Sequence, residues 1–414
     1  MKKSGRVANP FVYGRVLRGE DAACPRPVYE RAILDAIRDR GRLALAGDRR
    51  LGKSTLVERT HQTHRHAFLR WDFQGVLSVD DLVRRAAEDL EGFVRSLSPL
   101  ARRLTPWLRE VGLGVESIRL SYHGVQASLR TAIPTDHLKR LLGYLGEIAK
   151  RRAFSLFIDE LQDARDSLPE REGDAVLGVL RSELQRIPIS CFYAGSARES
   201  FRGLFVSDAS PFFESARMIE IDPIPPADFA AFIRAQFMKG GLEISPEALG
   251  VLLGIGGDSP NDVQHLAHET WNFALRNAIG AAEIGRALEK ILFDHTALGE
   301  AWLSQLTKRQ RRVLLATALY EHLGYATEEF LAAAGARNGA TIISALRPCA
   351  QGRLPIVEKF GSRYRVRSRY LRIWLITQRR VVQELIPSLR QEEAYRAAVR
   401  RVCPQLTVNL FAET

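Results

Sequence analysis

The feature that most constrains this chain is a glycine-rich octapeptide between a short apolar run and a helical pattern. Residues 47–54 read Gly-Asp-Arg-Arg-Leu-Gly-Lys-Ser and fit the pattern GxxxxGK[ST]. Residues 42–46 before it have the composition of a buried strand, and residues 55–59 after it favour a helix. In this context successive backbone N–H groups curl around an anion, and the positive end of the new helix points at it. The sequence therefore predicts a phosphate-binding loop.

Each residue of this loop is a candidate nucleotide contact. The expected contacts are Gly47, Asp48, Arg49, Arg50, Leu51, Gly52, Lys53, Ser54 and Thr55. Lys53 would reach the β and γ phosphates of ATP, and the Ser54 hydroxyl would bind Mg²⁺. Composition strengthens the assignment of Lys53, since the chain has 60 Lys and Arg residues of which nine are lysine. Arginine is the default cation here, so a lysine in this loop indicates a site that favours a compact ammonium.

Acidic and polar residues end two further strand-like runs. Asp159 and Glu160 follow the apolar residues 154–158, and Ser196 ends the run 189–195. At the carboxyl edge of a parallel sheet, Asp159 would hold the water shell of Mg²⁺ and Glu160 would polarise the attacking water. Ser196 would bond the γ-phosphate or that water. Arg198 and Arg217 are candidates for γ-phosphate contacts, within the chain or across a subunit contact.

Short apolar runs alternate with helical patterns up to residue 222, which predicts βα units and a parallel sheet. Strands are expected at 42–46, 68–73, 154–158, 189–195 and 218–221. The run Asp-Pro-Ile-Pro-Pro at 222–226 then ends the strand pattern, and capped helices follow. We expect an ATPase domain at 1–222, a helical lid domain at 223–305 and a third domain at 306–414. An insertion at about 74–153, with helices and a hairpin, either docks a partner or covers the surface.

The third domain reads as three helices followed by a hairpin around Gly361 and Ser362, which predicts a winged helix-turn-helix. From Arg337 to the end there are fifteen Lys and Arg against five Asp and Glu, so most of the formal charge of +12 is here. Double-stranded DNA is the expected partner. The candidate contacts are Arg337, Asn338, Thr341, Arg347, Arg363, Arg365, Arg367 and Arg369. The last four alternate, so we expect three or four of them to share one face of a strand as a phosphate track.

Taken together, these residues resemble the landmarks of a known group in their usual order. They are the segments 9–14, 25–26, 47–54, 158–162 and 195–196. The group is the prokaryotic, archaeal-type and STAND-like P-loop ATPases, related to AAA+ proteins. The resemblance implies an α/β P-loop NTPase fold with strand order 5-1-4-3-2, a helical lid and a C-terminal winged helix. It also implies that Phe11, Val12 and Tyr13 lie near the adenine of the nucleotide.

Two functions of different classes fit the sequence. One is an Mg²⁺-dependent ATPase that couples its nucleotide state to assembly, as an ATP-dependent homo-oligomer, and to DNA binding through the winged helix. The alternative is a nucleotide-dependent switch whose winged helix and insertion bind a protein effector. No stretch approaches about 18 apolar residues, so neither a membrane partner nor a targeting segment is expected, and the expected location is cytoplasmic. His61, His64 and His66 are expected to be solvated rather than metal ligands.

Overall fold

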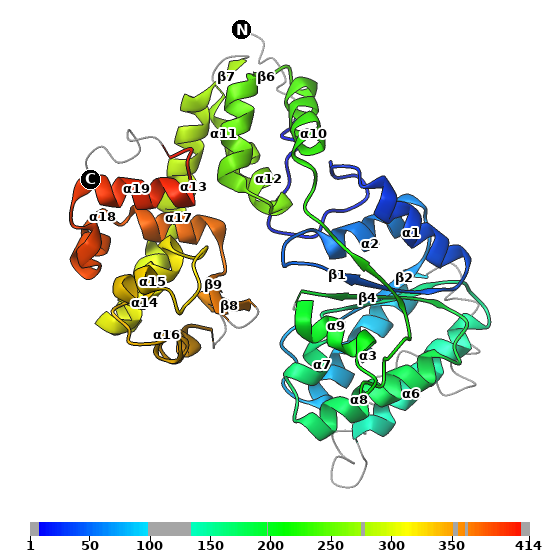
Figure 1. Cartoon of the computed structure of the whole chain (residues 1–414). Helices are drawn as coiled ribbons and strands as arrows, with labels where there is room; N and C mark the ends of the chain where they lie inside the picture. The colour runs from blue at the N-terminus through cyan, green and yellow to red at the C-terminus, as the bar shows by residue number, and fades with distance from the viewer. Residues whose placement is uncertain are drawn as a thin grey trace. The chain divides into compact units, whose positions relative to one another are not determined.

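The computed structural model describes residues 8–97, 134–196, 198–274, 278–350, 355–360 and 363–406 (Figure 1). The chain divides into two compact units between Asp222 and Pro223. The first, called the sheet unit below, comprises Arg18–Glu20 and Pro25–Asp222. The second, called the helical unit, comprises Pro223–Thr414 together with the N-terminal segments Met1–Leu17 and Asp21–Cys24.

The sheet unit is built on five parallel strands in the order β2-β3-β4-β1-β5. This confirms the predicted fold class and strand order. The strands are β1 (Arg42–Ala46), β2 (Phe68–Asp72), β3 (Ser155–Asp159), β4 (Ser190–Gly195) and β5 (Arg217–Glu220). Ala46 pairs with Gly195 and Asp72 pairs with Asp159, so the carboxyl ends of neighbouring strands lie together at one edge. The phosphate-binding loop leaves the sheet from this edge.

Helices cover both faces of the sheet because alternate strand residues point to opposite faces. Leu43 and Leu45 share one hydrophobic cluster with residues of α1 and α2, whereas Ala44 and Ala46 share another with residues of α3, α6, α8 and α9. Figure 1 shows α1 and α2 on one side of the sheet and the other four helices on the opposite side. The helices are α1 (Pro27–Arg38), α2 (Lys53–Thr63), α3 (Val79–Ser96), α6 (Pro134–Ala149), the short α7 (Asp163–Asp166), α8 (Glu170–Leu184) and α9 (Arg198–Val206). The result is a three-layer α/β/α unit.

The described part of the expected insertion belongs to the core of the sheet unit. Leu82 and Leu90 of α3 and Leu142 of α6 are fully buried, and they share a hydrophobic cluster with strand residues. These two helices therefore form part of the layer that covers the sheet. The helix expected at 100–110 and the alternating run at 115–122 lie outside the described residues.

The helical unit begins with four helices and two short strands that pair with each other. These elements are α10 (Pro226–Lys239), β6 (Glu243–Ile244), α11 (Pro246–Gly256), α12 (Pro260–Phe273), β7 (Ala278–Ile279) and α13 (Ala281–Gln305). The start of α11 follows the sequence signal: the Ser245 side chain accepts a hydrogen bond from the Ala248 N–H at 3.1 Å, and Pro246 is the first helical residue.

The rest of the helical unit contains the expected winged helix-turn-helix. Three helices precede an antiparallel hairpin, and further helices follow it. The elements are α14 (Lys308–Leu319), α15 (Glu328–Ala334), α16 (Gly339–Leu346), η1 (Arg347–Ala350), β8 (Val357–Phe360), β9 (Arg363–Val366), α17 (Arg369–Thr377), α18 (Arg379–Leu385), η2 (Pro387–Leu389) and α19 (Glu392–Val402). One hydrophobic cluster contains Phe229, Val313 and Val399, so the expected lid and winged-helix domains share a continuous core.

Among the residues that the structure describes, no helix has both the length and the apolar character needed to cross a membrane. Within the same residues all four cysteines are free, and three of them are buried.

Candidate active site

The phosphate-binding loop connects β1 to α2 in the sheet unit and depends on glycine at two places. Gly52, directly before α2, has a φ of +83°, in the left-handed region that suits glycine. At Gly47 a Cβ atom would lie 2.7 Å from the carbonyl oxygen of Ile221, so a side chain would push the loop away from the chain after β5. The backbone geometry thus explains both glycines of the motif.

Lys53 is the first residue of α2 and is 6% exposed. Its Nζ donates hydrogen bonds to the carbonyl oxygens of Gly47 and Asp48, each at 2.9 Å. Burial lowers the pKa of Lys53, and the nearby carboxylates of Glu160 and Asp159 oppose that shift. The loop therefore holds a desolvated cation by its own carbonyl groups, at the point where the motif predicts phosphate.

Ser54 and Asp159 meet at the carboxyl edge of the sheet. The Ser54 Oγ donates a hydrogen bond to Asp159 Oδ2 at 2.6 Å, although 105 residues separate them in the chain. Asp159 is buried, which raises its pKa, while the Arg70 guanidinium and the bond from Ser54 act in the opposite direction. A hydroxyl and a carboxylate are the oxygen ligands that Mg²⁺ prefers. The pair therefore fits the expected metal.

Glu160 is the next residue and turns away from the strand with a φ of +52°. Its Oε2 accepts hydrogen bonds from the Ser196 N–H at 3.0 Å, from the Ser196 hydroxyl at 2.8 Å and from Gln162 Nε2 at 2.6 Å. The structure thus brings the predicted base and the predicted sensor into direct contact. Gln162 was missed by the sequence analysis, although it lies two residues after the acidic pair.

Comparisons with known proteins bear on this arrangement. No protein-family model matches the chain, and no curated protein matches it in sequence. The structure is similar to a Walker-type ATPase of Pyrococcus abyssi, with a TM-score of 0.56 and 17% identity over 86% of this chain and 97% of that one. It is also similar to the ORC1 protein of Aeropyrum pernix, solved in complex with DNA, with a TM-score of 0.50 and 11% identity over 92% and 94%. This chain has a P-loop NTPase fold.

Arg70 is a residue of this P-loop site that the sequence analysis missed. Its Nη2 lies 2.8 Å from Asp159 Oδ2 and 2.9 Å from Asp72 Oδ2, and its Nη1 lies 3.1 Å from Glu58 Oε1. Arg70 on β2 pairs with Phe157 on β3, so Asp159 is its diagonal neighbour on the same face. The signal was an arginine between two apolar residues, Leu69 and Trp71, that are buried in the strand, and the abundance of arginine in the chain concealed it.

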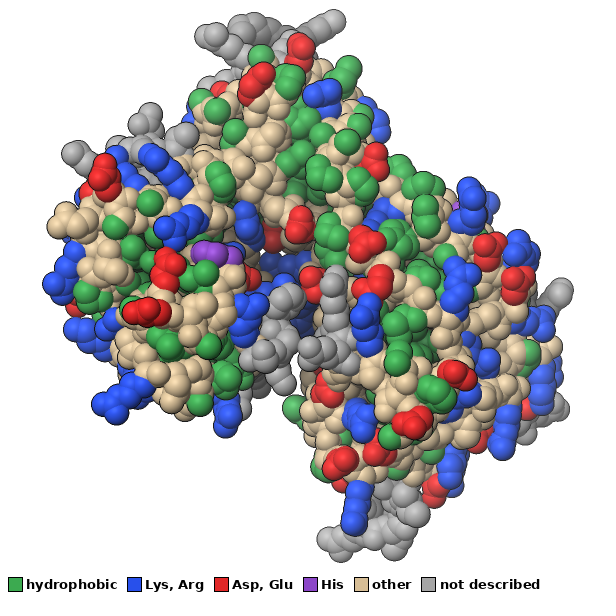
Figure 2. Space-filling view, viewed as in Figure 1, with side chains coloured by type: hydrophobic (Ala, Val, Ile, Leu, Met, Phe, Trp, Pro, Cys, Tyr) green, Lys and Arg blue, Asp and Glu red, His purple; other side chains and the backbone are tan. Residues whose placement is uncertain are grey.

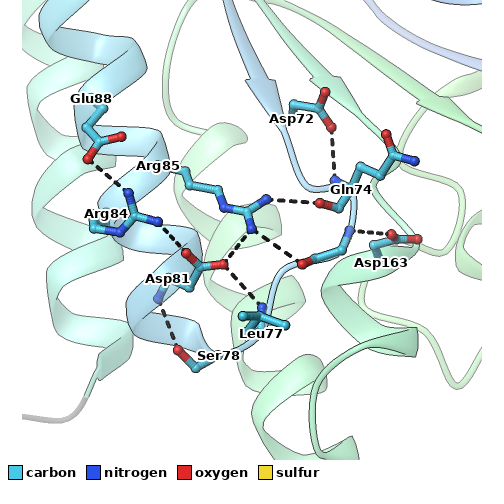
Figure 3. Close-up of polar contacts among 10 residues, drawn as sticks. Asp72, Gln74, Leu77, Ser78, Asp81, Arg84, Arg85, Glu88 and Asp163 are labelled. Carbon is cyan, nitrogen blue, oxygen red and sulfur yellow. Dashed lines mark hydrogen bonds and ion pairs between the residues drawn. The ribbon is translucent and has the colours of Figure 1, made fainter. Parts of the chain in front are cut away.

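A polar network fixes the turn after β2 beside the P-loop site (Figure 3). The Gly75 N–H donates to Asp163 Oδ2 at 2.9 Å, and Arg85 Nη1 donates to the Gln74 carbonyl at 2.9 Å. Burial raises the pKa of Asp163 to about 6, and the bond from Gly75 opposes that rise. Because Asp163 follows Glu160 by three residues, this turn and the acidic segment are held together.

Arg26 forms hydrogen bonds to the P-loop and to the end of the sheet unit. Its Nη1 donates to the carbonyl oxygen of Leu51 at 2.9 Å, and its Nη2 donates to the carbonyl oxygen of Asp222. One guanidinium thus joins the phosphate-binding loop to the end of the sheet unit. These two contacts give a structural role to Arg26, which the sequence analysis named only as part of the landmark segment 25–26.

The two arginine candidates near the sheet have different outcomes. Arg217 is exposed and pairs with Leu43 at the start of β5, so it lies at the amino edge of the sheet. The P-loop leaves the carboxyl edge, and the expected contact of Arg217 with a γ-phosphate in its own chain is therefore wrong. Arg198 begins α9, and its side chain lies outside the described residues. Contacts across a subunit boundary remain predictions for both.

Burial contradicts the expectations for Phe11 and His61. Phe11 is 1% exposed and packs against Phe237 and Trp271 inside the helical unit, with ring centroids at 4.7 and 6.2 Å, so this ring has no face for adenine. The same expectation for Val12 and Tyr13 stays a prediction. His61 is not solvated: it is fully buried, its Nδ1 lies 2.7 Å from the Val57 carbonyl oxygen, and burial lowers its pKa to about 4. Neither position could be placed without the tertiary contacts.

The arginines expected along the wing do not all lie on its strand. Strand β9 ends at Val366 and Arg369 begins α17, so the predicted alternation holds for Arg363 and Arg365 and is wrong for Arg369. Arg367 lies one residue beyond β9, and its N–H still donates to the Ile356 carbonyl at 2.9 Å. Several of these cations are held by nearby groups in the helical unit. The contacts are Arg363 Nη1 to the Leu323 carbonyl at 2.7 Å, Arg365 Nε to Glu358 Oε1 at 2.8 Å, and Arg369 to the carbonyls of Gly254 and Ile255 at 3.0 and 2.9 Å.

The helix before the wing presents a different set of candidates. Arg337 and Arg347, at the two ends of α16, are exposed. Asn338 is the N-cap of α16, and its Oδ1 accepts from the N–H and the hydroxyl of Thr341, each at 3.0 Å. On the face seen in Figure 2, Lys and Arg side chains are interspersed with Asp and Glu. Within the predicted DNA-contact set, α16 therefore offers the exposed cations.

Proposed function

We propose that the chain binds ATP with Mg²⁺ and hydrolyses it at the carboxyl edge of the sheet unit. The observation that carries this proposal is the meeting of Ser54 with Asp159 beside the contact of Ser196 with Glu160. The Ser54 hydroxyl and the Asp159 carboxylate can bind a metal ion, and the neighbouring Glu160 carboxylate can accept a proton. A phosphate loop alone would favour binding, and the adjacent glutamate adds the means for hydrolysis.

In this mechanism the backbone N–H groups of residues 47–54 and the Lys53 ammonium bind the phosphate oxygens. Ser54 and Asp159 would hold Mg²⁺, which would neutralise charge that develops on the phosphates. Glu160 orients the attacking water and accepts its proton. Ser196 fixes the Glu160 carboxylate through two hydrogen bonds, so that its direction is set before water is activated.

DNA binding through the winged helix is the second part of the proposal. It is supported by the exposed Arg337 and Arg347 on α16 and by the net positive charge from Arg337 onward. It also draws on the similarity to the A. pernix ORC1 protein, whose structure was solved in complex with DNA. Nucleotide-linked assembly of several copies would then place more than one basic surface on the same duplex.

One observation favours the alternative, a switch that binds a protein effector. Arg363, Arg365 and Arg369 donate to carbonyl or carboxylate oxygens within the helical unit, so they are less available for DNA phosphates than the sequence suggests. Three of the predicted DNA-contact arginines are thus already paired within the unit, which suits a protein surface better than a duplex backbone.

The test uses the full chain. Nucleotide binding and phosphate release are measured with and without Mg²⁺, and binding to a DNA duplex is measured at low and high salt. The proposal expects Mg²⁺-dependent hydrolysis and a steep loss of DNA binding as salt rises. Light scattering of the Glu160→Gln variant with ATP reports assembly. If no DNA or RNA binds at low salt or stimulates hydrolysis, the effector alternative replaces the DNA function.

A further inference from the structure

The site contains a cluster of ion pairs around Arg70 that the proposed ATPase mechanism does not use. Arg70 lies between carboxylates from three elements: Glu58 of α2, Asp72 of β2 and Asp159 of β3. The side chains of Glu58 and Asp159 are 13% and 7% exposed, and that of Arg70 is 30% exposed. The guanidinium therefore compensates negative charge that has little access to water.

The contact of Arg70 with Asp159 involves the atom that the metal site needs. Asp159 Oδ2 accepts from Ser54 Oγ at 2.6 Å and also from Arg70 Nη2 at 2.8 Å. A divalent ion, or a water bound to it, beside Ser54 would compete with the guanidinium for this oxygen. Two cations next to one carboxylate oxygen also repel each other, and the repulsion is strong where water is scarce.

We propose that Arg70 sets the concentration of divalent metal that the nucleotide site requires, by occupying Asp159 Oδ2 until the metal displaces it. The inference rests on the proposed function, because it concerns the same Mg²⁺-nucleotide site. Arg70 is a positioning residue here: it acts through Asp159, and it contacts neither nucleotide nor attacking water in this account.

The arrangement allows Arg70 to give way without being left unpaired. When Nη2 leaves Asp159 Oδ2, Asp72 Oδ2 at 2.9 Å and Glu58 Oε1 at 3.1 Å remain as partners. The Phe157 ring lies under the guanidinium, with its centroid 6.0 Å from Cζ, and so keeps it on this face of the sheet. Displacement of the guanidinium from Asp159 therefore leaves it two carboxylate partners.

The test is a Mg²⁺ titration of the binding of a fluorescent ADP analogue, which needs no turnover. Arg70→Met should lower the Mg²⁺ concentration for half-maximal binding by about five- to tenfold, because a charge-assisted bond to the metal ligand is removed. Arg70→Lys keeps the positive charge but loses the planar set of guanidinium donors. It should lower the Mg²⁺ concentration for half-maximal binding by about twofold. The matched control is Arg84→Met, since Arg84 is paired with Asp81 and Glu88 on α3, away from Asp159.

An unchanged or increased Mg²⁺ requirement in Arg70→Met would overturn the inference while leaving the ATPase proposal in place. If Arg70→Met does not fold, the same titration of Arg70→Lys decides: a requirement equal to or above that of the wild type overturns the inference. Wild-type protein that binds no nucleotide at saturating Mg²⁺ would instead refute the proposed function, and the inference with it.

Discussion

The Ser54 hydroxyl donates to Asp159 Oδ2 at 2.6 Å and so joins the first turn of α2 to the end of β3. This bond spans two segments that sequence motifs identify separately, and it sets the direction of both side chains. A hydroxyl that donates to a carboxylate keeps its lone pairs for a metal, so the pair can act as one unit.

We therefore predict that Ser54→Ala and Asp159→Asn are not additive. Each should weaken Mg²⁺-dependent nucleotide binding, and the double variant should lose less than the sum, with an interaction energy of about 1–3 kcal/mol. Calorimetry of nucleotide binding with Mg²⁺, on the wild type, both single variants and the double variant, gives this interaction energy as a double-mutant cycle. Ser182→Ala, at an exposed serine of α8, is the control. Additive losses would show that the two side chains act independently.

Lys53→Ala should abolish nucleotide binding. The variant removes the buried ammonium that the carbonyls of Gly47 and Asp48 hold in the loop. Lys150→Ala is the matched control, because Lys150 is an exposed lysine of the same unit, paired with Glu147. Equilibrium binding of labelled ATP measures both. Wild-type affinity in Lys53→Ala would contradict the assignment of the phosphate loop.

Glu160→Gln should bind ATP but hydrolyse it about 10²–10⁴ times more slowly, because glutamine keeps an oxygen acceptor for Ser196 and cannot take a proton. Single-turnover phosphate release separates this step from binding. Glu172→Gln, at an exposed residue of α8, should behave as the wild type. Equal turnover in Glu160→Gln and wild type would remove Glu160 from the mechanism.

His61 predicts a loss of stability in mild acid. Burial lowers its pKa to about 4 in the folded chain, below the ordinary value of 6.5, so the unfolded chain binds the proton more readily. The stabilisation is complete above pH 6.5 and is lost as the pH falls from 6.5 toward 4. At pH 5 this loss amounts to about 2 kcal/mol.

Urea unfolding of the wild type and of His61→Phe at pH 7.5 and pH 5 tests this prediction. The phenylalanine ring can occupy the same space beside Phe68 and Phe192, and it has no group to titrate. The stability of His61→Phe should therefore fall less between the two pH values. An identical fall in both proteins would mean that other groups cause the acid sensitivity.

The winged helix contains exposed arginines, which we predict to contact DNA, and arginines whose side chains bond to groups of the same unit. Arg337→Ala and Arg347→Ala should each weaken duplex binding without changing the stability of the fold. Each should also reduce the slope of the logarithm of the binding constant against the logarithm of the salt concentration by about 1. Arg369→Ala should instead cost about 1–3 kcal/mol of stability, since the carbonyls of Gly254 and Ile255 lose their donor. Arg186→Ala, an exposed change in the sheet unit, is the control. Wild-type DNA affinity in both α16 variants would exclude this helix as the contact.

Much of the fold was predictable because its signals are local. Strands β1 and β4 are short apolar runs, and the run after Asp222 breaks the strand pattern where the two compact units divide. The P-loop was predictable for the same reason, since eight consecutive residues carry the whole motif. The STAND subgroup, the DNA partner and the oligomeric state stay predictions.

The sequence by itself determined the parts of the protein that consecutive residues specify: the phosphate loop, the acidic pair at Asp159 and Glu160, and the alternation of strands with helices. The tertiary structure decided which side chains meet across elements. Arg70 reaches Asp159 because β2 and β3 pair in one register. Arg369 begins α17 rather than continuing the wing, and its guanidinium donates to carbonyls at the end of α11. Burial likewise decided that His61 is neutral and that Phe11 belongs to the core. Partners and solvent access depend on distances in space, and these arise only when segments far apart in the chain have packed together.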